Sequence, residues 1–93
     1  MLKVNASQAY ATDGSGAAWF TERCAEASVP VQYFVSRADL PCGSTIGPLT
    51  ATRLGLPTVD IGGPMLAMHS CRELASALDV PLVVGALTSC FAD

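Results

Sequence analysis

The sequence predicts an α/β sandwich in which short strands alternate with helices. Strand-like and helix-like segments follow one another along the chain without an internal repeat or a linker, which is the order expected of that class. The composition agrees with a packed interior, because 51% of the residues are hydrophobic, only 14% are charged, and the mean hydropathy is +0.42. A single domain of 93 residues leaves roughly a third or more of its unfolded surface exposed, so this composition indicates a chain that packs against further protein.

The first half of the chain predicts two strands with a helix between them. Residues 2–5 form a short strand, and the turn at 13–16 supplies a possible N-cap for a helix over about 15–28. Residues 29–35 are rich in β-branched and aromatic side chains and predict the second strand, whose start Pro30 places near a sheet edge. The expected buried face of the helix consists of Ala18, Phe20 or Trp19, and Cys24.

The second half predicts three helices and a third strand. A helix over about 44–54 is closed by Gly55, and residues 58–61 form a strand that ends in a glycine pair. Helical periodicity resumes at Met68, and Pro81 suits the first turn of a final helix. The apolar stripe expected of the helix after Met68 consists of Cys71, Leu74, Ala75 and Leu78.

Charge and hydropathy exclude two classes of partner. The net charge is −3 and the five basic residues are scattered, so no basic face for nucleic acid is expected. The start of the chain lacks an apolar signal core, and the run at 80–88 is shorter than the ~20 residues that span a bilayer. No Cys-x-x-Cys pair occurs among the four cysteines, which predicts free thiols in a reducing compartment and a cytoplasmic protein.

His69, the only histidine, is the natural candidate for a metal ligand. Neutral imidazole is the commonest protein ligand for zinc, and His69 follows a glycine-rich strand end. Glu73, one helical turn later, could orient the ring as an outer carboxylate. The alternative is a structural histidine, and one histidine cannot by itself hold a catalytic zinc.

Other candidate groups have a functional and a structural interpretation. The Cys-Gly-Ser-Thr-Ile-Gly loop at 42–47 could bind an oxyanion or a substrate backbone through its N–H groups, or simply cap a helix. Cys42, His69 and Asp39 supply the residue types of a thiol hydrolase, but their spacing does not support one.

Asp60 ends a strand, where a carboxylate can bind metal or substrate, although a capping or turn role is the simpler interpretation. Lys3 and Tyr10 belong to no motif of their own, which by default predicts solvated surface residues.

Taken from end to end, the chain resembles the carboxy-terminal part of the aspartyl aminopeptidases, a family of dinuclear zinc exopeptidases. The matching stretches follow in order: Lys3-Val4-Asn5 with Gln8 and Tyr10, Val29-Pro30-Val31-Gln32, Arg37 with Asp39, Pro41-Cys42-Gly43-Ser44-Thr45-Ile46-Gly47-Pro48, Arg53-Leu54-Gly55-Leu56, Val59-Asp60-Ile61-Gly62, Pro64, and Leu66-Ala67-Met68-His69-Ser70 with Arg72-Glu73.

This resemblance implies part of a three-layer sandwich of the zinc-exopeptidase type, with about three strands and four helices. It implies that His69 is the last zinc ligand, that Lys3 recognises the acidic side chain of the substrate, and that Tyr10 hydrogen-bonds the reacting group. It further implies a substrate pocket lined by the loop from Gly43 to Gly47, with Met68 beside the metal centre. The loop residues expected to bind substrate are Gly43, Ser44, Thr45 and Gly47.

The implied activity is removal of amino-terminal Asp or Glu from peptides. Two zinc ions would polarise the scissile carbonyl and activate a bridging water, while a glutamate moves protons. Residues 1–93 would be the carboxy-terminal portion of the catalytic domain, without the upstream ligands, the general base and the inserted domain of the family. The expected partners are therefore an acidic peptide and the missing upstream portion or homologous subunits.

Two readings compete with a working peptidase. One is an inactive truncated remnant that acts only as a binding or assembly module. The other is an independent small-molecule or anion-binding module that uses the helix start at Ser44 and Thr45.

Overall fold

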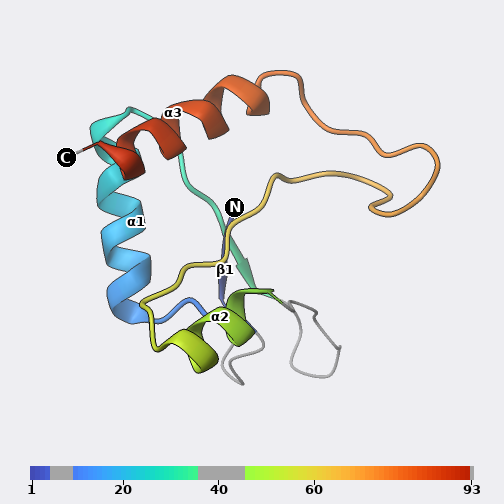
Figure 1. The fold of residues 1–93 in the computed structure, drawn as a ribbon. Coiled ribbons are helices and arrows are strands. Elements are labelled where there is room, and N and C mark those ends of the chain that lie inside the picture. The colour runs from blue at the N-terminus through green and yellow to red at the C-terminus, as the bar shows by residue number, and fades with distance from the viewer. Residues whose placement is uncertain (5–9, 36–45, 93) are drawn as a thin grey trace.

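The computed structural model describes residues 1–4, 10–35 and 46–92, and these ranges form a small α/β fold (Figure 1). Along the chain the elements are β1 (Leu2–Val4), α1 (Gly14–Glu26), β2 (Tyr33–Val35), α2 (Ile46–Leu54) and α3 (Asp79–Phe91). The predicted α/β class is thus confirmed, whereas a three-layer sandwich is not established by these elements.

The sheet is centred on β1. On one side β1 pairs in parallel with β2, with Leu2 opposite Tyr33 and Val4 opposite Val35. On its other side Leu2 forms a single antiparallel bridge with Ile61. There, the Lys3 N–H donates to the Asp60 carbonyl at 2.9 Å and the Gly62 N–H donates to the Met1 carbonyl, also at 2.9 Å.

Both later strand predictions were too long. The predicted third strand at 58–61 is reduced to the bridge at Ile61, because the Gly-Gly-Pro sequence that follows ends the extended pairing after one residue. The predicted second strand at 29–35 is regular only over Tyr33–Val35. Its first part contains Pro30, which has no N–H to give to a ladder.

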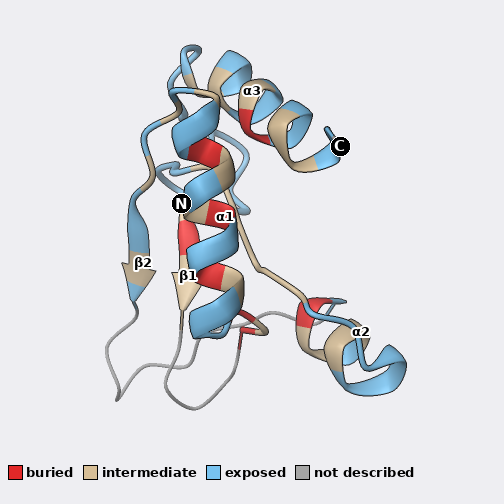
Figure 2. Ribbon diagram, turned by 90° about the vertical axis from the view of Figure 1, so that its left-hand side faces the viewer, coloured by how far each residue is buried: buried red, intermediate tan, exposed pale blue. Residues whose placement is uncertain are grey.

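Helix α1 provides most of the core. Asp13 caps its start, accepting the Gly16 N–H on the side-chain oxygen Oδ1 at 2.7 Å. Its buried residues are Ala17, Phe20 and Cys24, spaced to form one face that packs against Leu2 (Figure 2). The helix prediction is confirmed, but Ala18 and Trp19 are exposed and Ala17 takes the place expected for Ala18.

Helix α3 crosses α1 and completes the core. Ala86 is its buried residue, and the Ser89 hydroxyl donates to the Arg23 carbonyl of α1 at 2.7 Å. The predicted final helix is confirmed, although it begins at Asp79 rather than at Pro81. Helix α2 is confirmed over Ile46–Leu54 and ends at Gly55, which has the positive φ of 64° that glycine tolerates.

The helix predicted after Met68 is wrong. Residues 66–78, termed the His69 loop from here on, leave the body of the chain and return to α3 (Figure 1). The two arms of this loop meet in one antiparallel bridge between Leu66 and Leu74, with N–H to carbonyl distances of 2.8 and 3.1 Å. Positive φ angles at Ala67 and His69 interrupt any helix, and the expected apolar stripe has nothing to pack on, since Leu74 is 63% exposed.

Within the described ranges, no helix has the length and apolarity needed to cross a membrane.

Candidate functional site

Lys3 and Tyr10, which have no shared motif, lie against each other. The Lys3 Nζ is 5.5 Å from the centre of the Tyr10 ring, a distance at which the ammonium is attracted to the aromatic face. Tyr10 is only 4% exposed, and its ring meets Phe34 edge-on at 6.3 Å between centroids. The expectation that Tyr10 is a solvated surface residue is therefore wrong.

The stem of the Lys3 side chain crosses the backbone at Gly62. A Cβ placed at Gly62 would come within 2.8 Å of the Lys3 Cε and 3.3 Å of its Nζ. A side chain at position 62 would thus push the lysine aside, and glycine allows the ammonium to reach its place beside Tyr10.

The Asp60 side chain joins two segments that are far apart in sequence. Its Oδ2 accepts the Ala11 N–H at 2.7 Å, directly after Tyr10. Its carboxylate also presses on Gly47 in the first turn of α2, where an added Cβ would lie 2.3 Å from Oδ2. A negative charge beside the start of a helix is favourable, because the helix dipole is positive at that end.

The backbone N–H and carbonyl of Asp60 also form hydrogen bonds. Its N–H donates to the Thr12 hydroxyl at 2.8 Å, and its carbonyl accepts the Lys3 N–H and, more weakly, the Thr12 hydroxyl at 3.5 Å. Thr12 is itself only 5% exposed. The set formed by Lys3, Tyr10, Thr12, Gly47, Asp60 and Gly62 is called the Asp60 cluster below.

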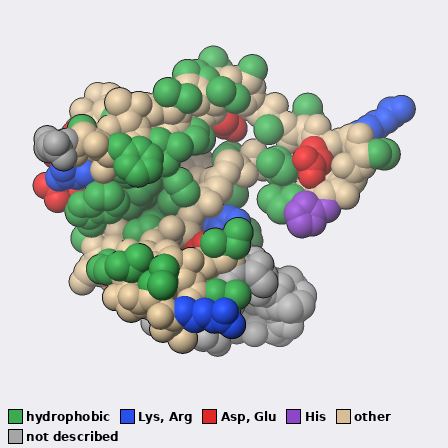
Figure 3. Space-filling model, viewed as in Figure 1, with side chains coloured by type: hydrophobic (Ala, Val, Ile, Leu, Met, Phe, Trp, Pro, Cys, Tyr) green, Lys and Arg blue, Asp and Glu red, His purple; other side chains and the backbone are tan. Residues whose placement is uncertain are grey.

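His69 lies at the surface of the projecting loop, away from the packed part of the chain. Figure 3 shows the loop as a lobe with the histidine on its surface and an acidic side chain next to it. The Glu73 carboxylate accepts the backbone N–H of His69, so the described contact fixes the main chain of the histidine. Short-range bonds complete the loop: the Ser70 N–H donates to the Ala67 carbonyl at 3.0 Å.

The candidate residues therefore divide into two groups. Lys3, Tyr10 and Gly47 belong to the Asp60 cluster, whereas Met68, His69 and Glu73 are on the His69 loop, where Met68 is 53% exposed. Gly43, Ser44 and Thr45 lie outside the described residues, as do Cys42 and Asp39. Sequence reasoning missed Thr12, which carries no motif, and the strand-end position of Asp60 was the one signal for its bridging role.

The donors of the described ranges do not suffice for a catalytic zinc site. These ranges contain no group of three or more His, Cys, Asp or Glu side chains placed to hold a metal ion. A catalytic zinc in proteins generally has three protein ligands, and the His69 loop offers one imidazole with Glu73 beside it. A zinc centre that includes His69 must draw its other ligands from elsewhere.

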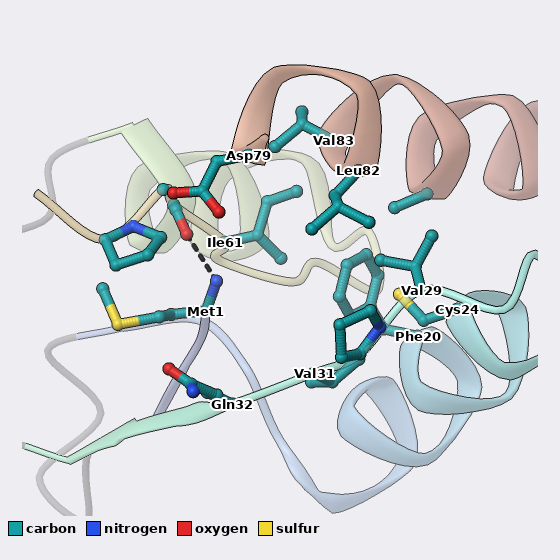
Figure 4. Close-up of a pocket in the computed structure, with 15 residues that line it drawn as sticks. Met1, Phe20, Cys24, Val29, Val31, Gln32, Ile61, Asp79, Leu82 and Val83 are labelled. Atoms are coloured by element: carbon teal, nitrogen blue, oxygen red, sulfur yellow. Dashed lines mark hydrogen bonds between the residues drawn. The ribbon is translucent and has the colours of Figure 1, made fainter. Parts of the chain in front are cut away.

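A separate cavity of about 400 Å³ lies between α1, α3 and the sheet (Figure 4). Its walls are mostly apolar, and the carboxylate on its rim is that of Asp79. Burial raises the pKa of the Cys24 thiol in its wall, as does the nearby Cys90, which keeps this sulfur protonated and unreactive. Cys24, Cys71 and Cys90 are free, so no described cysteine forms a disulfide.

Residues 1–91 match the family model described as Aminopeptidase I zinc metalloprotease (M18). Among curated relatives, the probable M18 family aminopeptidase 2 of Mycobacterium tuberculosis (strain H37Rv) is 58% identical over 87 residues, which are 94% of this chain and 20% of the relative. The protein of the same name from Ectopseudomonas mendocina (strain ymp) is 54% identical over 89 residues, 96% of this chain and 21% of the relative.

Solved structures agree with the sequence matches. A chain in the cryo-EM structure of the Ape4 and Nbr1 complex superposes with a TM-score of 0.92 at 47% identity, covering 97% of this chain and 17% of that one. The crystal structure of prApe1 gives a TM-score of 0.91 at 34% identity, covering 97% and 19% respectively. The chain thus spans about a fifth of the length of the curated relatives that it matches.

Proposed function

Because the chain belongs to the M18 family of aminopeptidase I zinc metalloproteases, we propose that it forms the carboxy-terminal portion of an aminopeptidase catalytic domain that removes amino-terminal acidic residues. The rest of that domain, including its other metal ligands, would come from protein beyond these 93 residues. We expect the assembled enzyme to act in the cytoplasm.

The contact between Lys3 and Tyr10 is the observation that supports the proposed acidic specificity. It holds an ammonium beside a phenol, and an ammonium forms a strong charge-assisted hydrogen bond with a carboxylate. Lys3 would bind the Asp or Glu side chain of the substrate, while the Tyr10 hydroxyl would hydrogen-bond the reacting group. Gly43, Ser44, Thr45 and Gly47 would line the pocket through their small side chains and backbone.

The His69 loop would supply the metal side of the reaction. His69 is the proposed zinc ligand, Met68 would lie beside the metal, and Glu73 would set the position of the histidine through its backbone N–H. Two zinc ions, bound jointly with residues outside this chain, would act as Lewis acids toward the scissile carbonyl. With the donors of its described residues alone, the chain would not turn over substrate.

The exposed apolar surface supports a partner that covers it. Large hydrophobic side chains are exposed on α2, on the His69 loop and on α3, among them Leu54, Leu66 and Val80 at 66–67%. A small protein with this much exposed apolar surface is expected to bury it in an interface. The proposed partner is the missing catalytic portion or a homologous subunit.

Complementation tests this proposal directly. An M18 aminopeptidase 2 from which the matching segment has been deleted would be mixed with the purified chain and zinc, and hydrolysis of an amino-terminal Asp peptide followed. We expect activity only in the mixture, loss with a chelator, and preference for Asp over an otherwise equal Ala peptide. Complex formation on a sizing column without any hydrolysis would contradict the enzymatic role.

That contradicting outcome would favour the second candidate, an inactive remnant that acts as a binding or assembly module. The small donor set and the exposed apolar surface are the observations in its favour.

A further inference from the structure

We propose that Asp60 is a positioning residue that fixes Tyr10 and Lys3 relative to the first turn of α2. Four residues from three separate segments meet at Asp60. The Asp60 carbonyl accepts the N–H of Lys3 in β1, and the Asp60 N–H donates to the Thr12 hydroxyl. The Asp60 carboxylate accepts the Ala11 N–H and lies against Gly47.

The carboxylate sets the position of Tyr10 through the next residue in the chain. The Ala11 N–H that it accepts at 2.7 Å belongs to the peptide unit that follows Tyr10. The Thr12 bonds fix the chain one residue further on. With both of these residues held, the Tyr10 side chain enters its buried place beside Phe34 from a defined backbone.

The Asp60 carboxylate lies so close to Gly47 that no side chain fits at position 47. A Cβ at position 47 would lie 2.3–2.4 Å from both carboxylate oxygens, well inside the contact distance of real Cβ atoms. The carboxylate therefore fills the space between Ala11 and α2. A longer Glu side chain would displace the helix, and Ala would leave the gap open.

The chemical consequence of this arrangement rests on the proposed function. If Tyr10 hydrogen-bonds the reacting group and Lys3 binds the substrate carboxylate, Asp60 acts on the reaction through both residues without touching the substrate. A displacement of about 1 Å at such a group can cost up to about 10²-fold in rate.

The test compares Asp60→Ala, Asp60→Asn, Gly47→Ala and the double variant Asp60→Ala/Gly47→Ala. Asp13→Ala serves as the matched control, because Asp13 also accepts a backbone N–H at 2.7 Å but lies at the exposed start of α1. The first readout is NMR of the 93-residue chain, following the exchange of the Ala11 amide and the shifts of the Tyr10 ring.

We expect Asp60→Ala to speed exchange of the Ala11 amide by about tenfold to a hundredfold, the worth of a hydrogen bond to a charged acceptor, and to move the Tyr10 ring shifts. Asp60→Asn should restore most of the Tyr10 shift, since an amide oxygen can still accept the Ala11 N–H. Asp13→Ala should alter neither signal. Gly47→Ala should reproduce the Asp60→Ala change and add little to it in the double variant.

The second readout is kcat and KM in the complemented enzyme. Asp60→Ala should lower kcat, counted per assembled active site, by about tenfold or more, and Asp60→Asn should recover it. Counting assembled sites removes the effect of a smaller folded fraction, which by itself would also lower the apparent kcat. If the wild-type mixture shows no hydrolysis while the NMR changes occur as expected, the proposed function fails and the positioning role of Asp60 stands.

Three results would overturn the proposal. The first is a wild-type Ala11 amide that exchanges as fast as in an unfolded chain. The second is an Asp60→Ala variant that leaves the exchange of this amide unchanged. The third is independent, additive effects of Gly47→Ala and Asp60→Ala, which would mean that the two positions do not meet.

Discussion

The Asp60 cluster and the His69 loop carry the two halves of the proposed chemistry, but they are held in different ways. In the cluster, Asp60 bonds directly to segments on either side of it in space, and Tyr10 and Thr12 are buried. In the loop, the described bonds join residues of the loop to one another, apart from the Asp79 N–H at the start of α3, which donates to the Ser76 carbonyl at 3.1 Å. Every residue from 66 to 78 is exposed.

This difference identifies the region that would gain most from the proposed partner. Ordering a backbone costs roughly 1–2 kcal/mol per residue, so a segment without burial is not held in one place by its own contacts. The Asp60 cluster is ordered by contacts within the chain. The His69 loop would gain its fixed position, and His69 its metal, from the remainder of the catalytic domain.

The largest expected effect is on the loop. In the complemented enzyme, His69→Ala should reduce hydrolysis of an Asp peptide by about 10³-fold or more, because it removes a ligand of the metal that lowers the barrier. Cys71→Ser, an exposed change on the same loop, is the control and should retain activity. Equal activity of the His69 variant and the wild type would remove the loop from the chemistry.

Substitution of a buried core residue should lower the stability of the chain, whereas substitution of an exposed residue on the His69 loop should change it little. Phe20→Ala should lower the free energy of unfolding of the chain by about 3–5 kcal/mol, since it empties a buried aromatic site. Leu74→Ala, at a position 63% exposed, should change it by about 0.5 kcal/mol or less. Urea denaturation followed by Trp19 fluorescence measures both, and similar losses for the two variants would show that the loop is packed in solution.

Within the cluster, Lys3→Met should act on specificity. It keeps the stem that crosses Gly62 and removes the ammonium, so kcat/KM for an Asp peptide should fall by about tenfold to a hundredfold, the worth of a charged hydrogen bond. The same value for an Ala peptide should change little. A parallel fall for both substrates in the complemented enzyme would mean that Lys3 supports the fold and does not read the carboxylate.

The smallest expected effect is a dependence of stability on alkaline pH. Burial raises the pKa of the Cys24 thiol, so the folded chain keeps this proton to higher pH than the unfolded chain does. The contribution of Cys24 to the free energy of unfolding should therefore be fully present below about pH 8.5, the ordinary thiol pKa, and be lost as the pH rises through the folded value. Cys24→Ala should flatten this fall in urea titrations, and Cys71→Ala, on the exposed loop, should not.

The sequence predicted elements where local signals and burial agree. Asp13 and the spacing of Phe20 and Cys24 predicted α1, and Gly55 marked the end of α2. The helix expected after Met68 failed because its apolar stripe is exposed and packs on nothing within the described residues, and periodicity alone cannot tell such a stripe from a buried helix face.

For the candidate site, the resemblance supplied residue roles but not their arrangement. Nothing in the spacing of Lys3 and Tyr10 predicts that the ammonium of one lies over the ring of the other. The contact depends on the path of the Lys3 side chain past Gly62, which is distant in sequence. The bonds of Thr12 and Asp60 link residues that are 48 positions apart, and such long-range pairs leave no local pattern.

The contact between Gly47 and the Asp60 carboxylate also constrains how this sequence can diverge. Neither position can accept a larger residue while the other stays as it is, so single substitutions at either site meet a barrier that a paired substitution avoids. Relatives in which position 47 carries a side chain should have a smaller residue at position 60, together with another acceptor for the amide after the tyrosine. Compensating substitutions at positions 47 and 60 in such relatives would thus be evidence that the two positions are in contact.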